Sequence, residues 1–134
     1  MLNINTISDV QSADIDIKDP VTGVSLGASI TLAGPEHPKR KALEFARQRK
    51  ARAAIQKTGK VQFGDPEDDA QDNIEFLAAC TLGWTGIADG DKPVEFSPAE
   101  ALKLYSNESL QWLTVQLMAA MGERERFINS SALA

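Results

Sequence analysis

The sequence predicts an α+β domain in which an N-terminal β-hairpin precedes a mostly helical body of about four helices. Three observations lead to this prediction. Apolar and polar residues alternate with a period of two before residue 33, which is typical of half-buried strands. After residue 38, apolar residues recur at helical spacing instead. The 134-residue length suits a single domain, and a hydrophobic content of 43% is enough to bury a core.

The clearest strand pattern lies in residues 13–33, which we predict to form a β-hairpin. Charged residues alternate with apolar ones over 14–18, and small or polar residues alternate with apolar ones over 24–32. Between these runs, residues 19–23 contain a proline that presets a turn dihedral and a glycine that permits positive φ. A hairpin is only marginally stable alone, so we expect its apolar face to pack on the helices. Residues 1–12 show no clear period and are expected to form a loosely held tail.

We predict a helical body over residues 38–128. Its first helix is expected to begin near Pro38 and to end before Gly59, because proline favours the first helical turn and glycine the C-terminal cap. An aspartate followed by a proline at 65–66 predicts the start of the second helix. The apolar stripe of this second helix continues to Leu82.

Loops and caps are predicted between and after these helices. Residues 58–65 are expected to form a linker, and residues 84–96 read as a loop because they contain two glycines and a proline. The Ser-Pro-Ala-Glu sequence at 97–100 is a capping box, which predicts a short third helix. Ser-Asn at 106–107 interrupts that helix and can cap the last one. Residues 129–134 look like a frayed end.

The sequence offers few residues for catalysis. Cys80 is the sole cysteine and His37 the sole histidine, so no internal disulfide and no thiolate metal cluster can form. Cys80 lies in an apolar stretch, where a cysteine usually behaves as a small buried hydrophobe, and His37 lies in an expected loop. No phosphate-binding glycine loop and no metal-ligand spacing is present. We therefore expect a protein that is not an enzyme and has no cofactor and no metal.

No membrane association is expected. No apolar run approaches the roughly 20 residues that cross a bilayer. The N-terminal residues lack the basic start and apolar block of a secretory signal, so we expect the protein to act in the cytoplasm. The net charge of −5 argues mildly against a nucleic-acid partner for the molecule as a whole.

The most distinctive feature of the sequence is its charge segregation. Residues 39–60 contain nine bases, opposed by Glu44 alone: Lys39, Arg40, Lys41, Arg47, Arg49, Lys50, Arg52, Lys57 and Lys60. Residues 65–75 then contain six acids and no base: Asp65, Glu67, Asp68, Asp69, Asp72 and Glu75.

Three interpretations of this segregation remain open. In the first interpretation, the basic helix presents a solvated face whose charges partly pair with those of the acidic helix beside it. Runs of charged residues usually form solvated faces of this kind. Alternatively it is a docking face for an acidic protein partner, with Arg47 and Lys50 as candidate partner-binding residues. Nucleic-acid binding is the least favoured, because the helix has one aromatic residue and the neighbouring acids would repel phosphates.

Apolar residues in the second half supply further candidates for partner binding. Trp112, Leu117 and Met121 belong to a large apolar surface on the last helix. Core packing is its default explanation, and a helix–helix assembly seam or self-association is the alternative, since Met and Trp are common at adaptable interfaces. Trp84 could anchor its loop on the core or lie exposed in an interface.

Three segments of the second half resemble tail assembly chaperones of long-tailed bacteriophages and prophages. They are FLAACTLGWTGI at 76–87, VEFSPAEALKLY at 94–105 and ERERFI at 123–128. The order of a short β element, a basic helix and a compact helical body is also similar, so the resemblance covers roughly residues 14–128.

The resemblance implies a function but no site residues. It implies a protein of the host bacterial cytoplasm that coats the tape-measure protein, keeps it soluble and recruits tail-tube subunits during tail morphogenesis. A structural virion component, such as a neck, tail-completion or decoration protein, is the first alternative. A small nucleic-acid-associated regulator that uses the 39–60 helix is the second.

Overall fold

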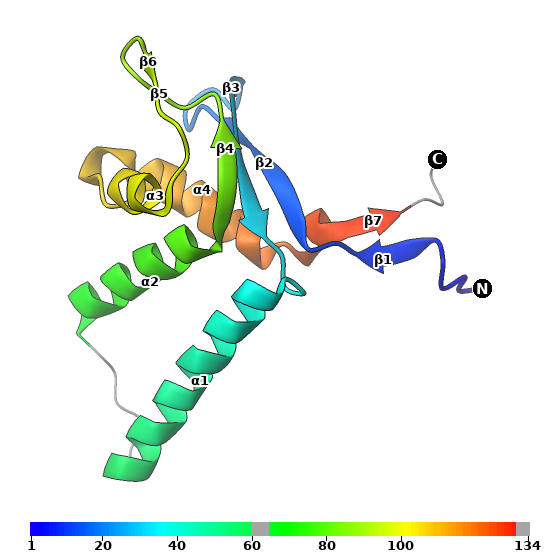
Figure 1. Ribbon diagram of the computed structural model, residues 1–134, viewed down its shortest axis with the longest axis vertical. Coiled ribbons are helices and arrows are strands. Elements are labelled where there is room, and N and C mark those ends of the chain that lie inside the picture. The colour runs from blue at the N-terminus through cyan, green and yellow to red at the C-terminus, as the bar shows by residue number, and fades with distance from the viewer. Residues whose placement is uncertain (60–64, 131–134) are drawn as a thin grey trace.

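The computed structural model, which describes residues 1–59 and 65–130, has the expected α+β architecture (Figure 1). The predicted linker therefore lies largely outside the described residues. The strands are β1 (Ile7–Asp9), β2 (Ser12–Lys18), β3 (Ser25–Ala33), β4 (Thr81–Thr85), β5 (Ala88–Asp89), β6 (Lys92–Pro93) and β7 (Ile128–Ser130). The helices are α1 (Pro38–Thr58), α2 (Pro66–Cys80), α3 (Pro98–Tyr105) and α4 (Gln111–Gly122), with 3₁₀ turns at Glu108–Leu110 and Arg124–Phe127.

The central sheet has three antiparallel strands in the order β2-β3-β4. The predicted hairpin is confirmed, with Ile15 opposite Ile30. The third strand corrects the sequence analysis, which extended the second helix to Leu82 and placed a loop from Trp84. Helix α2 instead ends at Cys80, and the chain turns directly into β4, where Trp84 pairs with Ile30. Pairing with β3 outweighs the helical periodicity, because a third strand stabilises the otherwise marginal hairpin.

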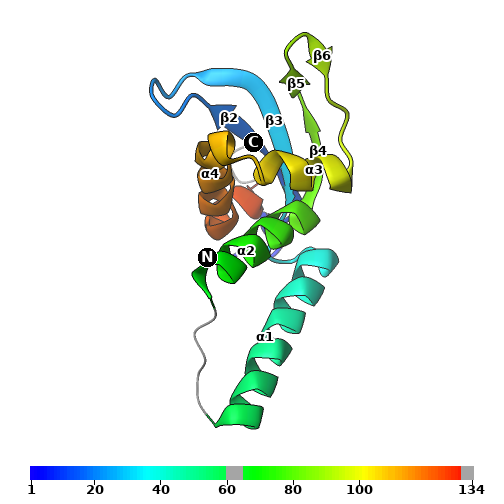
Figure 2. The same ribbon diagram turned by 90° about the vertical axis from the view of Figure 1, so that its left-hand side faces the viewer.

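Helices α2, α3 and α4 cover one face of this sheet (Figures 1 and 2). The core between the layers includes the fully buried Ile30, Leu32, Leu77, Tyr105 and Leu117. The opposite face carries the exposed aspartates of β2, and Asp14 accepts a hydrogen bond from Thr31 across the strand pair. One face of the hairpin is thus exposed to solvent and the other is buried, as its period-two pattern predicts.

The chain ends meet in a short ribbon that the sequence analysis did not foresee. Strand β1 pairs antiparallel with β7, with Ile7 opposite Ser130 and Asp9 opposite Ile128. The expectation of a loose tail over residues 1–12 is therefore corrected for β1 and for the start of β2. The expected frayed end over 129–134 is corrected for its first two residues, and its last four lie outside the described residues.

Local start signals placed the starts of α1, α2 and α3 correctly, whereas the last helix, expected directly after Asn107, begins as an α-helix only at Gln111. The side chain of Asp65 accepts a hydrogen bond from Glu67 N at 3.1 Å, and that of Ser97 accepts one from Glu100 N at 3.1 Å. Asn107 caps the 3₁₀ turn that leads into α4 by accepting from Ser109 N at 2.9 Å. Within the described part of the chain, no helix is long and apolar enough to cross a membrane.

Candidate interaction surfaces

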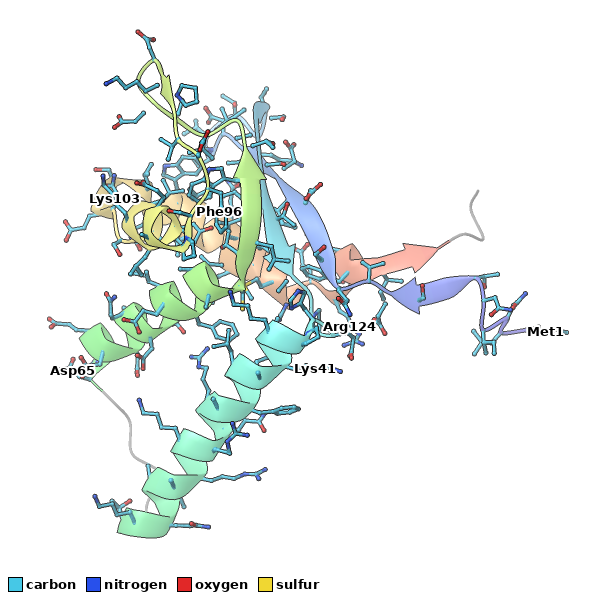
Figure 3. The ribbon with its side chains drawn as sticks, viewed as in Figure 1. Met1, Lys41, Asp65, Phe96, Lys103 and Arg124 are labelled. Atoms are coloured by element: carbon cyan, nitrogen blue, oxygen red, sulfur yellow. The ribbon has the colours of Figure 1, made fainter. Side chains whose placement is uncertain are left out.

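Helix α1 projects from the body, and its N-terminal turn is firmly anchored there (Figures 1 and 3). Arg40 is its buried residue, and the Arg40 guanidinium donates to the backbone carbonyls of Ala33 at 3.1 Å and Met121 at 3.0 Å. Glu36, just before the helix, forms ion pairs with Lys41 at 2.6 Å and with Arg124 at 3.2 Å. These two cations hold the pKa of the Glu36 carboxyl below its usual value. The base of α1 is thus fixed, and most residues of the rest of the helix are exposed.

Arg47 joins α1 to α2 within the chain. Its guanidinium lies 4.7 Å from the ring centroid of Phe76, and its Nη2 donates to Asn73 Oδ1 at 3.2 Å. The cation–π contact uses the planar guanidinium in a way that a lysine would not reproduce. Of the two candidate residues on this helix, Arg47 is therefore engaged in an intramolecular contact, whereas Lys50 is exposed.

The outward side of α1 carries a mixed apolar and basic stripe. Phe45, Arg49 and Arg52 follow one another by four and three residues, so they share one face of the helix. All three are exposed, Phe45 by 52% of its surface. Leu43 and Arg47 precede Phe45 and Arg49 by two residues, about 200° around the helix, and contact the body and α2. The stripe therefore points away from α2.

The acidic residues of α2 form a matching stripe. Asp68, Asp72 and Glu75 follow one another by four and three residues, so they share one side of the helix, and all three are exposed. Within residues 1–59 and 65–130, no ion pair links a base of α1 to an acid of α2. The expected pairing of the two charged helices is therefore not made among the described residues, and both remain solvated.

Trp84 anchors the segment that follows β4. Its indole Nε1 donates to the carbonyl of Val94 at 2.8 Å, and its ring makes an edge contact with Phe96 at a centroid distance of 5.1 Å. Trp84 is only half-buried, and with Ile87, Leu104 and other residues it lines a hollow of ≈ 210 Å³. Glu100 and Lys103 border this hollow from α3. Trp84 therefore both anchors its loop and lines an open concavity in which apolar and charged side chains are mixed.

A second, larger hollow lies between α2 and α3. Its volume is ≈ 320 Å³, and its apolar lining includes Ala79, Leu82, Phe96 and Leu102. Glu75 of α2 and Lys39 of α1 also line it, so one acid and one base of the chain border the same hollow. Phe96 lies beside α3 in Figure 3.

The apolar face of α4 belongs largely to the core. Leu117 is 0% exposed and Met121 is 4% exposed, so neither can contribute to a surface in this fold. Trp112 is half-buried and packs against the same core. Core packing, the default explanation of this stripe, therefore holds for Leu117 and Met121, and their alternative role as partner-binding residues is corrected.

The nucleophilic and metal-binding chemistry weighed from the sequence finds no arranged site in the described residues. Cys80 is fully buried, and burial raises the pKa of its thiol to about 11. His37 Nδ1 accepts from Lys39 N at 3.1 Å and so acts as the N-cap of α1. No group of three or more His, Cys, Asp or Glu side chains there could hold a metal ion.

Sequence reasoning identified the charged helices but missed the orientation of their stripes. The spacing of Phe45, Arg49 and Arg52 could have shown that these residues share one face of the helix. The two hollows could not have been predicted, because they depend on strand β4, which the sequence analysis missed.

Comparison of the chain with protein-family models, curated proteins and solved structures finds no match.

Proposed function

We propose that this protein is a tail assembly chaperone of a long-tailed bacteriophage or prophage. It acts in the host bacterial cytoplasm, where it binds the tape-measure protein and recruits tail-tube subunits. The resemblance of residues 76–87, 94–105 and 123–128 to this family indicates the class of function. The hollow beside Trp84 is the structural observation that carries the proposal, because a chaperone for a long helical client needs a concave apolar surface.

The hollow suits one apolar side chain of an amphipathic helix. Its walls combine the indole of Trp84 with the aliphatic side chains of Ile87 and Leu104. Glu100 and Lys103 lie three residues apart on α3 at its border, so they supply one acidic and one basic contact for charges that flank the client's apolar residue. Helix-in-groove recognition combines apolar anchors with polar contacts at the rim in this way.

Co-expression with the products of neighbouring genes, followed by pull-down and mass spectrometry, tests the proposal. We expect recovery of a very long helical protein or of a tail-tube subunit. Substitution Ala88→Trp fills the hollow from an exposed position and should reduce client recovery at least about tenfold, equivalent to about 1.4 kcal/mol. Ala99→Trp adds the same side chain at an exposed position of α3 outside the hollow and should leave recovery unchanged.

Two outcomes would contradict the chaperone. If the pull-down recovers neither client and the protein remains stably bound in purified particles, it is a structural virion component. If it instead recovers nucleic acid whose binding weakens with salt, the regulator becomes the better assignment.

A further inference from the structure

We propose that the acidic border of the hollow beside Trp84 binds an arginine side chain of the client. The arginine lies next to the apolar client residue that enters the hollow, and its guanidinium pairs with Asp89 and Glu100. This inference rests on the proposed function, because it names the client residue that flanks the apolar anchor at the same hollow. It follows from the charges that line the hollow, from their lack of partners and from the aromatic ring beside them.

Three charged side chains line the ≈ 210 Å³ hollow, and two of them are acids. Asp89 belongs to β5, whereas Glu100 and Lys103 belong to α3. The β5–β6 hairpin stands above α3 in both views (Figures 1 and 2), so the two acids reach the hollow from different elements. The border of the hollow therefore carries a net negative charge, which favours a cation over an anion in the bound segment.

The two carboxylates have no ion-pair partner in the part of the chain that the structure describes. Lys103 follows Glu100 by three residues, and Lys92 lies opposite Asp89 in the β5–β6 pair, yet neither lysine forms an ion pair with the acid. Glu100 is half-buried beside apolar side chains, where a carboxylate without a cation is less favourable than in water. Both acids are thus available to a guanidinium from another protein.

The ring of Trp84 offers this guanidinium a surface to stack on. The hydrogen bond from Nε1 to the Val94 carbonyl and the edge contact with Phe96 fix the position of the ring. The ring is half-buried and lines the same hollow as Asp89 and Glu100. Tryptophan is the best aromatic partner for a cation, and a planar guanidinium can stack on it while donating paired hydrogen bonds to a carboxylate. These features favour arginine over lysine.

The second hollow has no such preference for a cation. The ≈ 320 Å³ concavity between α2 and α3 is lined by one acid, Glu75, and one base, Lys39, so its border has no net charge. Its aromatic residue is Phe96, and phenylalanine attracts a cation less strongly than tryptophan does. The arginine site is therefore confined to the hollow beside Trp84.

Nuclear magnetic resonance titration of the protein alone tests this site without the client. The probe is a helical alanine-based peptide of about 16 residues that carries one leucine and, four residues later, one arginine. Two matched peptides carry citrulline, which is similar in shape to arginine but uncharged, or glutamate at that position. We expect the Trp84 Nε1–H signal to shift, with a dissociation constant at least about threefold lower for the arginine peptide than for the citrulline peptide and highest for the glutamate peptide. The indole signal of Trp112, which does not line the hollow, should not move.

Two neutralising variants distinguish charge pairing from apolar contact. Glu100→Gln should remove most of the preference for arginine over citrulline, because it removes an attraction. Lys103→Gln should increase that preference, because it removes a repulsion. The controls Asp91→Asn and Lys92→Gln remove the same charges from residues of the β5–β6 hairpin that do not line the hollow, so they should leave the preference unchanged.

Several results of these titrations would overturn the inference. They are equal affinity for the arginine and citrulline peptides, a preference for glutamate, effects of the controls as large as those of Glu100→Gln and Lys103→Gln, and no saturable shift of Trp84 with any peptide. Circular dichroism of every variant verifies that the helices remain folded. Because the titrations use the protein alone, they can fail while the pull-down still recovers the client, which leaves the chaperone assignment standing. A pull-down that recovers no client contradicts the assignment and this inference together.

Discussion

Arg40 Nη2 donates a 3.0 Å hydrogen bond to the backbone carbonyl of Met121, which ties the first turn of α1 to the last turn of α4. The same guanidinium donates to Ala33 at the end of β3 and lies 5.9 Å from the ring centroid of Phe127. One side chain thus connects a strand, a helix and the C-terminal turn. This connection sets the direction in which α1 leaves the body.

Removing this connection should destabilise the whole domain. Substitution Arg40→Ala leaves the carbonyls of Ala33 and Met121 without their buried donor, so we expect unfolding free energy to fall by about 2 to 4 kcal/mol. Urea denaturation measures the change. Arg49→Ala, at an exposed position of the same helix, should shift stability by less than about 0.5 kcal/mol. Equal effects of the two substitutions would refute the anchoring role.

The parts of the fold that sequence predicted correctly are those fixed by neighbouring residues. The hairpin follows from strict alternation, and the starts of α2 and α3 follow from side-chain caps at Asp65 and Ser97. Strand β4 was missed because the residues after Cys80 continue a helical stripe, and only pairing with β3, far away in sequence, makes them a strand. The pairing of β1 with β7 joins the chain ends, so no local pattern could reveal it.

The tight turn after β4 should tolerate no side chain. Gly86 has φ +75°, and a Cβ there would collide with the backbone oxygen of Gly27 in the neighbouring strand. We expect Gly86→Ala to lower the unfolding free energy by about 3 kcal/mol, combining left-handed strain with this collision. Gly90→Ala has the same sign of φ but open space around the added methyl, so it should cost only about 1 kcal/mol. Thermal denaturation of both variants decides whether the collision matters.

The candidate surfaces were only partly predictable. Composition located the charges, but whether Arg47 contacts a partner or its own α2 depends on the position of Phe76 in the folded chain. The periodicity of α4 likewise revealed an apolar stripe containing Leu117 and Met121. It could not say which surface covers that stripe, because a core helix and an interface helix have the same pattern.

One buried hydroxyl should be dispensable. Thr114 Oγ1 is buried, and the described residues offer it no hydrogen-bond partner. We expect Thr114→Val, which keeps the shape and removes the unpaired group, to raise stability by about 1 kcal/mol in urea denaturation. The control is Thr81→Val. Thr81 Oγ1 donates a hydrogen bond to the carbonyl of Leu77 at 2.8 Å and accepts one from the Tyr105 hydroxyl at 2.8 Å. Removing this hydroxyl should therefore lower the unfolding free energy by about 1 to 3 kcal/mol.

Alkaline pH should destabilise the protein through two buried acids. Burial raises the pKa of Cys80 from 9.0 to about 11 and that of Tyr105 from 10.0 to about 12. In each case the unfolded chain loses its proton at a lower pH than the folded chain. Stability from these groups is therefore fully present below about pH 9 and is lost progressively as the pH rises toward 12.

The slope of this loss identifies its source. Each group should contribute up to about 1.4 kcal/mol per pH unit between its unfolded and folded pKa. Urea denaturation of Cys80→Ala and of Tyr105→Phe, at several pH values from 8 to 11, should give a shallower decline than wild type, even though each variant starts from a lower stability. An unchanged slope in both variants would mean that other groups, such as the lysines, cause the alkaline loss. Because only the difference in slope is compared, the cavity left by Cys80→Ala does not affect the conclusion.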